Sequence, residues 1–171
     1  MRTDDMLDEL LDARDIDAIE GVLVKRRTTA EQIQKIYNWC VYCEAAIDID
    51  TDKSYLLMAA HRHTPSNVLV GIKGFAYDSL VDGPTDLEIE LMIELAKNPN
   101  TPVTILVDMA NDNITTPPEV LAILADNADV NTRVAVAKNL RTPSGALAKL
   151  SNDQSERVRA GAVWNKNIRR I

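Results

Sequence analysis

The chain of 171 residues has the length of one domain, which can bury about two thirds of the surface of its unfolded form. Hydrophobic residues make up 46% and charged residues 26% of the chain, which excludes an intrinsically disordered protein, and no apolar run reaches the roughly 18–20 residues of a membrane span. The net charge of −7 disfavours nucleic acid as a partner, because contacts to a phosphate backbone require cations.

The N-terminal segment "TDDMLDELLDARDIDAIEGVLVKRR" predicts two short helices divided near Asp15, which is a suitable N-cap residue. Residues 1–50 contain six Lys/Arg and twelve Asp/Glu, so this N-terminal segment is strongly acidic. It has no apolar signal core, which predicts a cytoplasmic protein with no membrane contact. The acidic residues of the first helix are the candidate sites for binding another protein: Asp4, Asp5, Asp8, Glu9 and Asp12.

The next segment, "TTAEQIQKIYNWCVYCEAAI", predicts a longer helix that begins with a capping box formed by Thr28 and Glu31. Cys40 and Cys43 form a C-x-x-C pair within it, which could supply two metal ligands or a redox dithiol. A structural zinc site needs four ligands, and no second pair is present. We therefore expect both thiols to pack as small hydrophobic groups on one helix face, with metal binding or redox chemistry as the alternative.

Two polar segments follow that superficially suggest metal sites. Asp48, Asp50 and Asp52 alternate as in a calcium loop, but the glycine and the terminal glutamate of an EF-hand are absent. His61 and His63 precede a Thr-Pro pair, where histidine at a helix C-terminus complements the helix dipole. Neither segment predicts a metal site.

A short sequence motif that begins with Thr-Pro recurs along the chain, at Thr64, Thr101, Thr116 and Thr142. Apolar residues stand five and eight residues after each Thr, a spacing that places them on one face of a helix. We expect Thr to be the N-cap and Pro the first residue of each short helix. These apolar positions are Leu69, Leu106, Leu121 and Leu147, then Ile72, Met109, Leu124 and Leu150, with a weaker instance at Ile33 and Ile36 after Thr28.

A second, Ala-rich kind of helix lies between these units, in "EIELMIELAKN", "NTRVAVAKN" and "SERVRAGAVWN", and usually ends in Asn. The 15 residues from Thr101 to Thr116 leave no room for one there. Because aromatic residues are only 4% of the chain, the core must be aliphatic, which favours helices over a β-sandwich. The sequence therefore predicts an all-α fold, an α-solenoid of short alternating helices in one domain, residues 1–171, with divergent helices in 1–84 and more regular repeats in 85–171.

The stretches "NPNTPVTILVDMANDN" and "TPPEVLAILADNADVNTRVAVAKNLRTPSGALAKLSNDQSERVRAGAVWN" resemble the variant leucine-rich repeats of bacteria, with the pattern N-P-x-T-P, L-x-x-L-A-x-D and V-R-x-x-V-A-x-N. The resemblance covers about residues 89–167. It implies a right-handed superhelix similar to HEAT-type stacks, in a family of interaction scaffolds. A founding member carries an iron–sulfur cluster in a cysteine-rich region, but this chain has only Cys40 and Cys43, so no cofactor is implied.

No nucleophile–base set and no phosphate-binding glycine loop is recognisable, so we expect no enzymatic activity. The expected function is binding to another protein, and the acidic charge favours a basic partner, as when an inhibitor or immunity-type protein binds a nuclease. No oligomeric state is implied. The alternative is contact with nucleic acid through the basic C-terminal end, residues Arg157, Arg159, Lys166, Arg169 and Arg170.

Overall fold

The computed structural model describes residues 3–47, 51–75 and 84–168, and within these ranges the protein is all-α, as predicted. Eleven helices follow one another in the described ranges, and α3 is the longest of them. Their bounds are α1 (Thr3–Ala13), α2 (Ile16–Leu23), α3 (Ala30–Ile47), α4 (Asp52–Ala60), α5 (Ser66–Phe75), α6 (Asp86–Lys97), α7 (Val103–Asn111), α8 (Pro118–Leu124), α9 (Val130–Lys138), α10 (Ser144–Leu150) and α11 (Glu156–Ile168).

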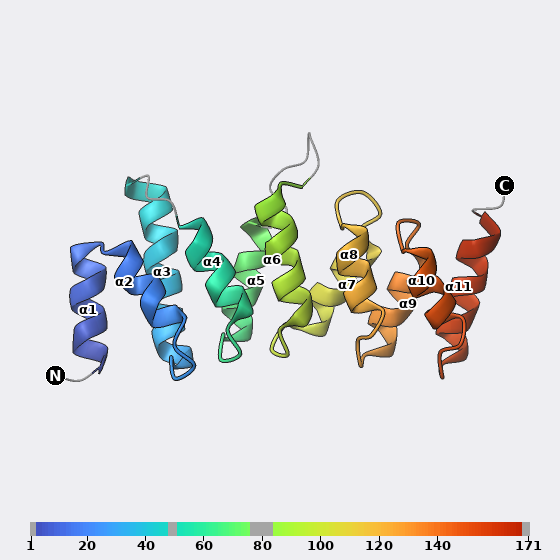
Figure 1. Ribbon diagram of the computed structural model, residues 1–171, viewed down its shortest axis with the longest axis horizontal. Coiled ribbons are helices and arrows are strands. Elements are labelled where there is room, and N and C mark those ends of the chain that lie inside the picture. The colour runs from blue at the N-terminus through green and yellow to red at the C-terminus, as the bar shows by residue number, and fades with distance from the viewer. Residues whose placement is uncertain (1–2, 48–50, 76–83, 169–171) are drawn as a thin grey trace.

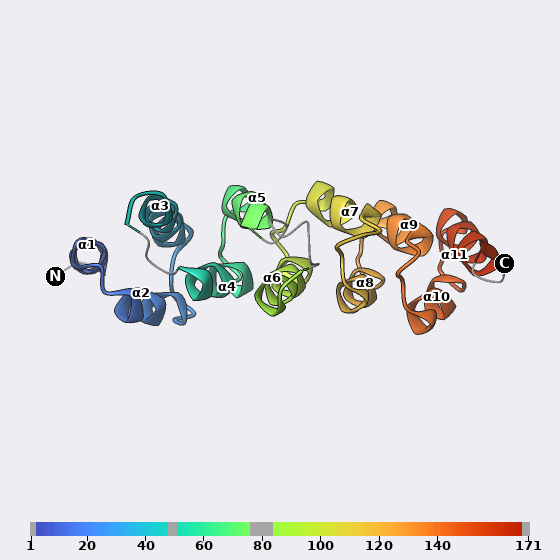
Figure 2. The same cartoon turned by 90° about the horizontal axis from the view of Figure 1, so that it is seen from above.

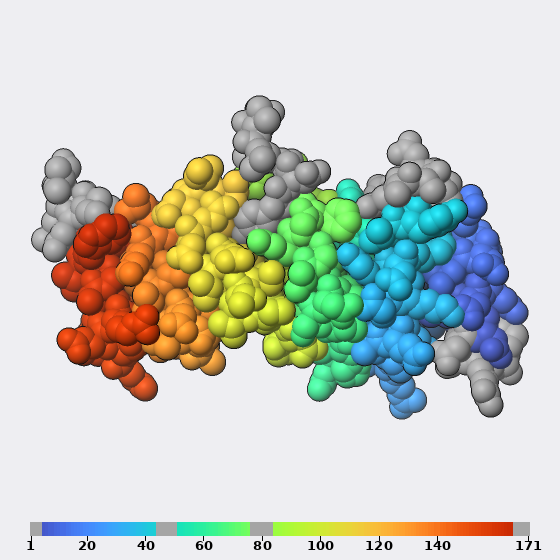
Figure 3. All heavy atoms as spheres, turned by 180° about the vertical axis from the view of Figure 1, so that it is seen from behind, coloured from blue at the N-terminus to red at the C-terminus, as the bar shows by residue number. Residues whose placement is uncertain are grey.

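The helices form two rows along the long axis of the molecule, with the two ends of the chain at opposite ends (Figures 1 and 2). Helices α2, α4, α6, α8 and α10 make one row, here called the even row. Helices α3, α5, α7, α9 and α11 make the odd row, with α1 beside α3. Contacts within rows are most extensive between α9 and α11, α7 and α9, and α4 and α6. Figure 3 shows the opposite face, on which the segments succeed one another in chain order.

One hydrophobic core runs through the whole stack, from Leu7 in α1 to Ala162 in α11. It is mainly aliphatic, as the composition predicted. The predicted helix division at Asp15 is confirmed, since the Asp15 carboxylate accepts a hydrogen bond of 3.1 Å from the N–H of Ala18. The apolar residues predicted to line the interior are all buried, at Ile33, Ile36, Leu69, Ile72, Leu106, Met109, Leu121, Leu124, Leu147 and Leu150.

Three turns between helices share one hydrogen-bond pattern. The residue that ends the helix, His61, Asn98 or Asn139, accepts a hydrogen bond from the backbone N–H two residues later, at 3.2, 3.0 and 2.8 Å. The Thr three residues later donates its backbone N–H to the carbonyl oxygen of that same residue. The prediction that Asn ends the second kind of helix is therefore confirmed for α6 and α9.

The threonines of three Thr-Pro pairs cap the preceding helix and not the following one. The hydroxyls of Thr64, Thr101 and Thr142 donate to the carbonyl oxygen six residues earlier, at 2.5, 2.7 and 2.6 Å. The predicted N-cap role is wrong because the turn folds each Thr back against the last carbonyl groups of the helix before it, which lack partners within the helix. Pro102 and Pro143 occupy the N-cap positions instead, without a side-chain hydrogen bond.

The start of α3 follows the same rule. The hydroxyl of Thr28 donates to the carbonyl oxygen of Val22 at 2.5 Å, so the predicted capping box of Thr28 and Glu31 is wrong. The reciprocal bonds join the next pair along the chain, Thr29 and Gln32, at 3.1 and 3.2 Å. The capping pattern is present but displaced by one residue, because Thr28 is engaged by α2.

Three asparagine side chains each bind a helix to its neighbour in the same row. The amide of Asn98 donates to the carbonyl oxygens of Ala59 and His61 at the end of α4, at 2.7 and 3.0 Å. Asn139 makes the same pair of bonds to the end of α7, and Asn165 to the end of α9. These amides therefore satisfy helix-end carbonyl groups that would otherwise be buried without partners.

His61 takes the place of Asn in this scheme. Its Nδ1 accepts from the N–H of His63, so the ring proton lies on Nε2, which faces the carbonyl oxygen of Lys25 at 3.1 Å. The imidazole thus joins the end of α4 to the α2–α3 turn.

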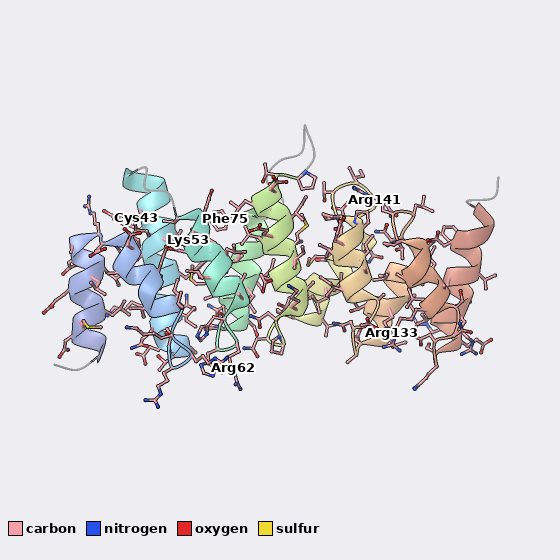
Figure 4. All side chains as sticks on the ribbon, in the orientation of Figure 1. Cys43, Lys53, Arg62, Phe75, Arg133 and Arg141 are labelled. Carbon is pink, nitrogen blue, oxygen red and sulfur yellow. The ribbon has the colours of Figure 1, made fainter. Side chains whose placement is uncertain are left out.

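The two kinds of helix exchange rows at the junction of α7 and α8. Helices that follow Thr-Pro lie in the odd row as α5 and α7, but in the even row as α8 and α10. The exchange arises because α8 directly follows α7, as the short spacing from Thr101 to Thr116 predicted. The recurring turns therefore lie along the lower edge of Figure 4 before α7, at Arg62, and along the upper edge after it, at Arg141.

Candidate functional site

The outer side of the even row carries a groove formed by α2, α4 and α6. Two adjoining hollows of about 620 and 370 Å³ share Leu56. Half-buried aliphatic side chains and carboxylates line both hollows. We call this surface the even-row groove, and its residues are Ile16, Asp17, Glu20, Asp52, Lys53, Leu56, Leu57, Ala60, Leu87, Glu90, Ile93 and Glu94.

The charge of the groove is predominantly negative. Its one lysine, Lys53, is paired with Glu20, whose side chain is only 9% exposed. The hydrogen bond and charge of Glu20, together with the nearby Asp17, raise the pKa of Lys53. Glu94 is paired with Lys97 at 2.9 Å, and Glu90 is exposed on the same helix. A cationic side chain entering the groove would therefore meet both carboxylates and apolar carbon.

The acidic residues predicted on the first helix lie on α1, which contacts α2, one of the helices that form the even-row groove. Asp5, Asp8, Glu9 and Asp12 are exposed on α1, and Asp8 forms an ion pair with Lys35 of α3. The side chain of Asp4 lies outside the described residues. The structure thus brings the described members of this set to one helix surface, but not into the groove.

Cys40 and Cys43 are both buried in the interior, as predicted for thiols that pack as small hydrophobic groups. Burial raises the pKa of the Cys43 thiol, and the charge of Arg14 only partly opposes this effect. Among the described residues, no three His, Cys, Asp or Glu side chains are grouped so that they could hold a metal ion. Asp48 and Asp50 of the calcium-like segment lie outside the described residues.

Of the basic residues predicted at the C-terminal end, the structure describes the side chains of Arg157 and Arg159. Arg157 is exposed, whereas Arg159 donates to the carbonyl oxygens of Asp153 and Gln154 at 2.8 and 2.9 Å and so holds the α10–α11 turn. Arg169, Arg170 and the side chain of Lys166 lie outside the described residues. Arg157 lies in a hollow of about 540 Å³ together with Val134, Lys138, Ala160, Gly161 and the exposed Trp164.

A second basic surface lies on the edge formed by the α2–α3 and α4–α5 turns. The two turns are in direct contact, since His61 Nε2 and His63 Nδ1 lie 3.1 Å from the carbonyl oxygens of Lys25 and Thr28. Figure 4 shows Arg62 at this edge. We call this surface the basic loop edge, and its exposed side chains are Lys25, Arg26, Arg27, Arg62 and His63.

Sequence reasoning missed both surfaces. The groove residues come from three helices, and its half-buried aliphatic residues follow the same spacing as core residues. The basic loop edge had a recognisable signal, because Arg26 and Arg62 both stand two residues before a turn threonine, Thr28 or Thr64. Aligning the turns with one another, in place of the helices, would have found it.

No described helix is both long and apolar enough to cross a membrane. Comparisons with models of protein families, with curated proteins and with solved structures found no match. The geometry of the surfaces described above is therefore the basis for assigning a function.

Proposed function

We propose that the protein is a non-enzymatic binding module that holds a basic, amphipathic segment of another protein in the even-row groove. The observation that carries the proposal is that half-buried aliphatic side chains line the groove together with the carboxylates of Asp17, Glu20, Asp52, Glu90 and Glu94. An inhibitor or immunity-type protein acting on a basic enzyme is one form that such a module takes.

We also propose that the scaffold is a right-handed α-solenoid of degenerate repeats, similar to variant leucine-rich and HEAT-like repeats. The recurring turn supports this proposal, because the turns after α6 and α9 use the same Asn amide and the same Thr hydroxyl to join neighbouring helices. In such a stack each unit contacts mainly its neighbours, which leaves an extended surface for a partner.

The groove suits a basic segment for two reasons. Aliphatic side chains such as Leu56 and Ile93 are only half-buried, so a partner can still bury apolar area against them. The surrounding carboxylates select a cationic partner and accelerate its approach. The acidic surface of α1, with Asp5, Asp8, Glu9 and Asp12, adds to this attraction at a distance.

The test begins with capture of partners from a native lysate on the immobilised protein, followed by titration of the purified partner by calorimetry. The groove variant Asp17→Lys/Glu90→Lys should weaken binding about tenfold or more, since both exposed carboxylates become repulsive. The variant Asp5→Lys/Asp12→Lys tests α1 separately and should mainly slow association.

The matched control is Glu119→Lys/Glu156→Lys, which makes the same charge change at exposed positions outside the groove. It should bind the partner as the wild-type protein does. Loss of binding in the control, or full binding by the groove variant, would contradict the proposed site. Recovery of an acidic partner alone would contradict the proposed partner class.

A second candidate function is contact with single-stranded nucleic acid at the hollow between α9 and α11. The favouring observation is the half-exposed ring of Trp164 beside two cations, Lys138 and Arg157, since base stacking on aromatic rings and phosphate contacts combine in such sites. Anisotropy titration of a labelled deoxythymidine 12-mer should then show binding that falls steeply with salt and is lost in Trp164→Ala. Absence of binding at low salt eliminates this candidate.

A further inference from the structure

The basic loop edge stands out because the rest of the N-terminal half is acidic. No described carboxylate forms an ion pair with Lys25, Arg26, Arg27 or Arg62. By contrast, Lys35, Lys53 and Lys97 are each paired with a carboxylate. Four exposed cations that form no ion pair with a described residue thus lie on two turns that are held together by hydrogen bonds. The edge is therefore a preorganised surface of positive charge.

A small hollow opens at this edge between α1 and the α2–α3 turn, with a volume of about 160 Å³. Its apolar side is formed by Met6, Leu7 and Val22, and its polar side carries Lys25 and Arg27. The hollow also lies against Thr29 and Gln32, at the amino-terminal end of α3, where the helix dipole adds positive potential. A cavity of about 150 Å³ can hold a group of the size of benzene.

We propose that the basic loop edge binds a short acidic segment of another protein, which inserts one apolar side chain into this hollow. Its carboxylates pair with Arg27 and with Arg62 of the neighbouring turn. This site is independent of the even-row groove, because it is formed by the turns and α1 and takes a ligand of opposite charge.

Two observations favour an acidic peptide over a nucleic acid. Among the described residues of the edge and its hollow there is no Trp, Tyr or Phe on which a base could stack. The exposed carboxylates of α1, including Asp5 and Glu9, would repel a long polyanion that extends beyond the edge. A short segment needs to reach only the cations and the hollow.

The experiment is fluorescence anisotropy with a fluorescein-labelled probe peptide, Glu-Asp-Leu-Glu-Asp, at low and at physiological salt. The wild-type protein should bind it, and a peptide with Gly in place of Leu should bind about tenfold more weakly, because the hollow loses its apolar ligand. The double variant Arg27→Glu/Arg62→Glu should weaken binding of the Leu peptide about tenfold or more.

The matched control is Lys73→Glu/Lys149→Glu, which makes the same charge change outside the edge, its hollow and the other two surfaces, and it should leave peptide binding unchanged. Met6 lines the hollow and is partly exposed, so Met6→Asp tests the hollow directly. This variant should reduce the difference in affinity between the Leu peptide and the Gly peptide. Circular dichroism confirms that each variant is folded.

Each of four outcomes would overturn the proposal: no binding of the Leu peptide by the wild-type protein, equal binding of the Leu and Gly peptides, equal loss in the control variant, or tighter binding of a deoxythymidine 12-mer that depends on Arg27 and Arg62. The last outcome would assign the edge to nucleic acid. Because the Asp17→Lys/Glu90→Lys variant leaves this edge intact, failure here is distinguishable from failure of the groove.

Discussion

The hydroxyl of Thr142 donates a hydrogen bond of 2.6 Å to the carbonyl oxygen of Val136, six residues earlier and at the end of the preceding helix. The same relationship joins Thr101 to Leu95 and Thr64 to Met58. Thr142 is fully buried, so its hydroxyl has no access to water as an alternative partner. Each of these three threonines is thus a link between two helices.

Replacing Thr142 with Val should lower the free energy of unfolding by about 1–2 kcal/mol, because it removes a buried hydrogen bond while keeping the shape of the side chain. Thr142→Ser retains the hydroxyl and should cost less than Thr142→Val. Urea denaturation measures both, with the exposed Thr104→Val as the control. Equal stability of Thr142→Val and wild type would show that the hydroxyl contributes nothing.

His61→Asn should preserve most of the stability of the turn, because Asn98 and Asn139 make the equivalent bonds in the other turns. His61→Ala should cost about 1–3 kcal/mol, since it removes the acceptor for the His63 N–H and the donor to Lys25 in a buried position. Thermal unfolding of the two variants makes the comparison. If Asn proves as damaging as Ala, the equivalence of the turns is wrong.

The ion pair of Arg133 and Asp153 should make stability depend on pH. The hydrogen bond from Arg133 lowers the pKa of Asp153 in the folded protein. Its stabilisation is therefore complete above the usual Asp pKa of about 4 and is lost as the pH falls through the lower folded-state pKa. The destabilisation caused by Asp153→Asn should be about 1–3 kcal/mol at pH 7 and should diminish toward pH 2.

The control for that prediction is the pair formed by Lys149 and Asp126, whose side chains are 60% and 61% exposed. Asp126→Asn should change the unfolding free energy by no more than about 0.5 kcal/mol at either pH, because solvent screens an exposed pair. A similar pH effect in both variants would contradict the special role of Arg133.

Gly161 and Gly145 offer a matched pair of substitutions. A Cβ on Gly161 would lie 3.1 Å from the Cβ of Ala137, where α11 packs closely on α9, so Gly161→Ala should cost about 1 kcal/mol or more. A Cβ on Gly145 meets no atom within 4 Å, and Gly145→Ala should stabilise the protein by about 0.4–1 kcal/mol. Chemical denaturation should give opposite signs for the two changes.

Cys40 and Cys43 should react slowly with a thiol reagent such as dithionitrobenzoate in the folded protein, because both are buried and burial raises the pKa of Cys43. Both should react rapidly in denaturant. Rapid reaction of the native protein, or iron or zinc found by elemental analysis, would point instead to the metal or redox alternative.

Much of the fold could be predicted from the sequence, because caps and apolar spacing act over a few residues. Asp15 divides α1 from α2, and the Leu positions after each Thr-Pro are buried, as expected. The role of Thr could not be predicted in this way, since its hydroxyl can serve the helix on either side and only the folded turn decides. The even-row groove and the basic loop edge arise from packing between segments that are distant in sequence.

The exchange of helix types at the α7–α8 junction has a consequence for the symmetry of the molecule. Before the junction the recurring turns occupy one edge and the Thr-Pro helices the odd row, whereas after it both positions are reversed. Corresponding turns of the N-terminal and C-terminal parts, at Arg62 and at Arg141, therefore lie on opposite edges of the molecule. A ligand that followed equivalent turns from one end to the other would have to cross from one edge of the molecule to the opposite edge.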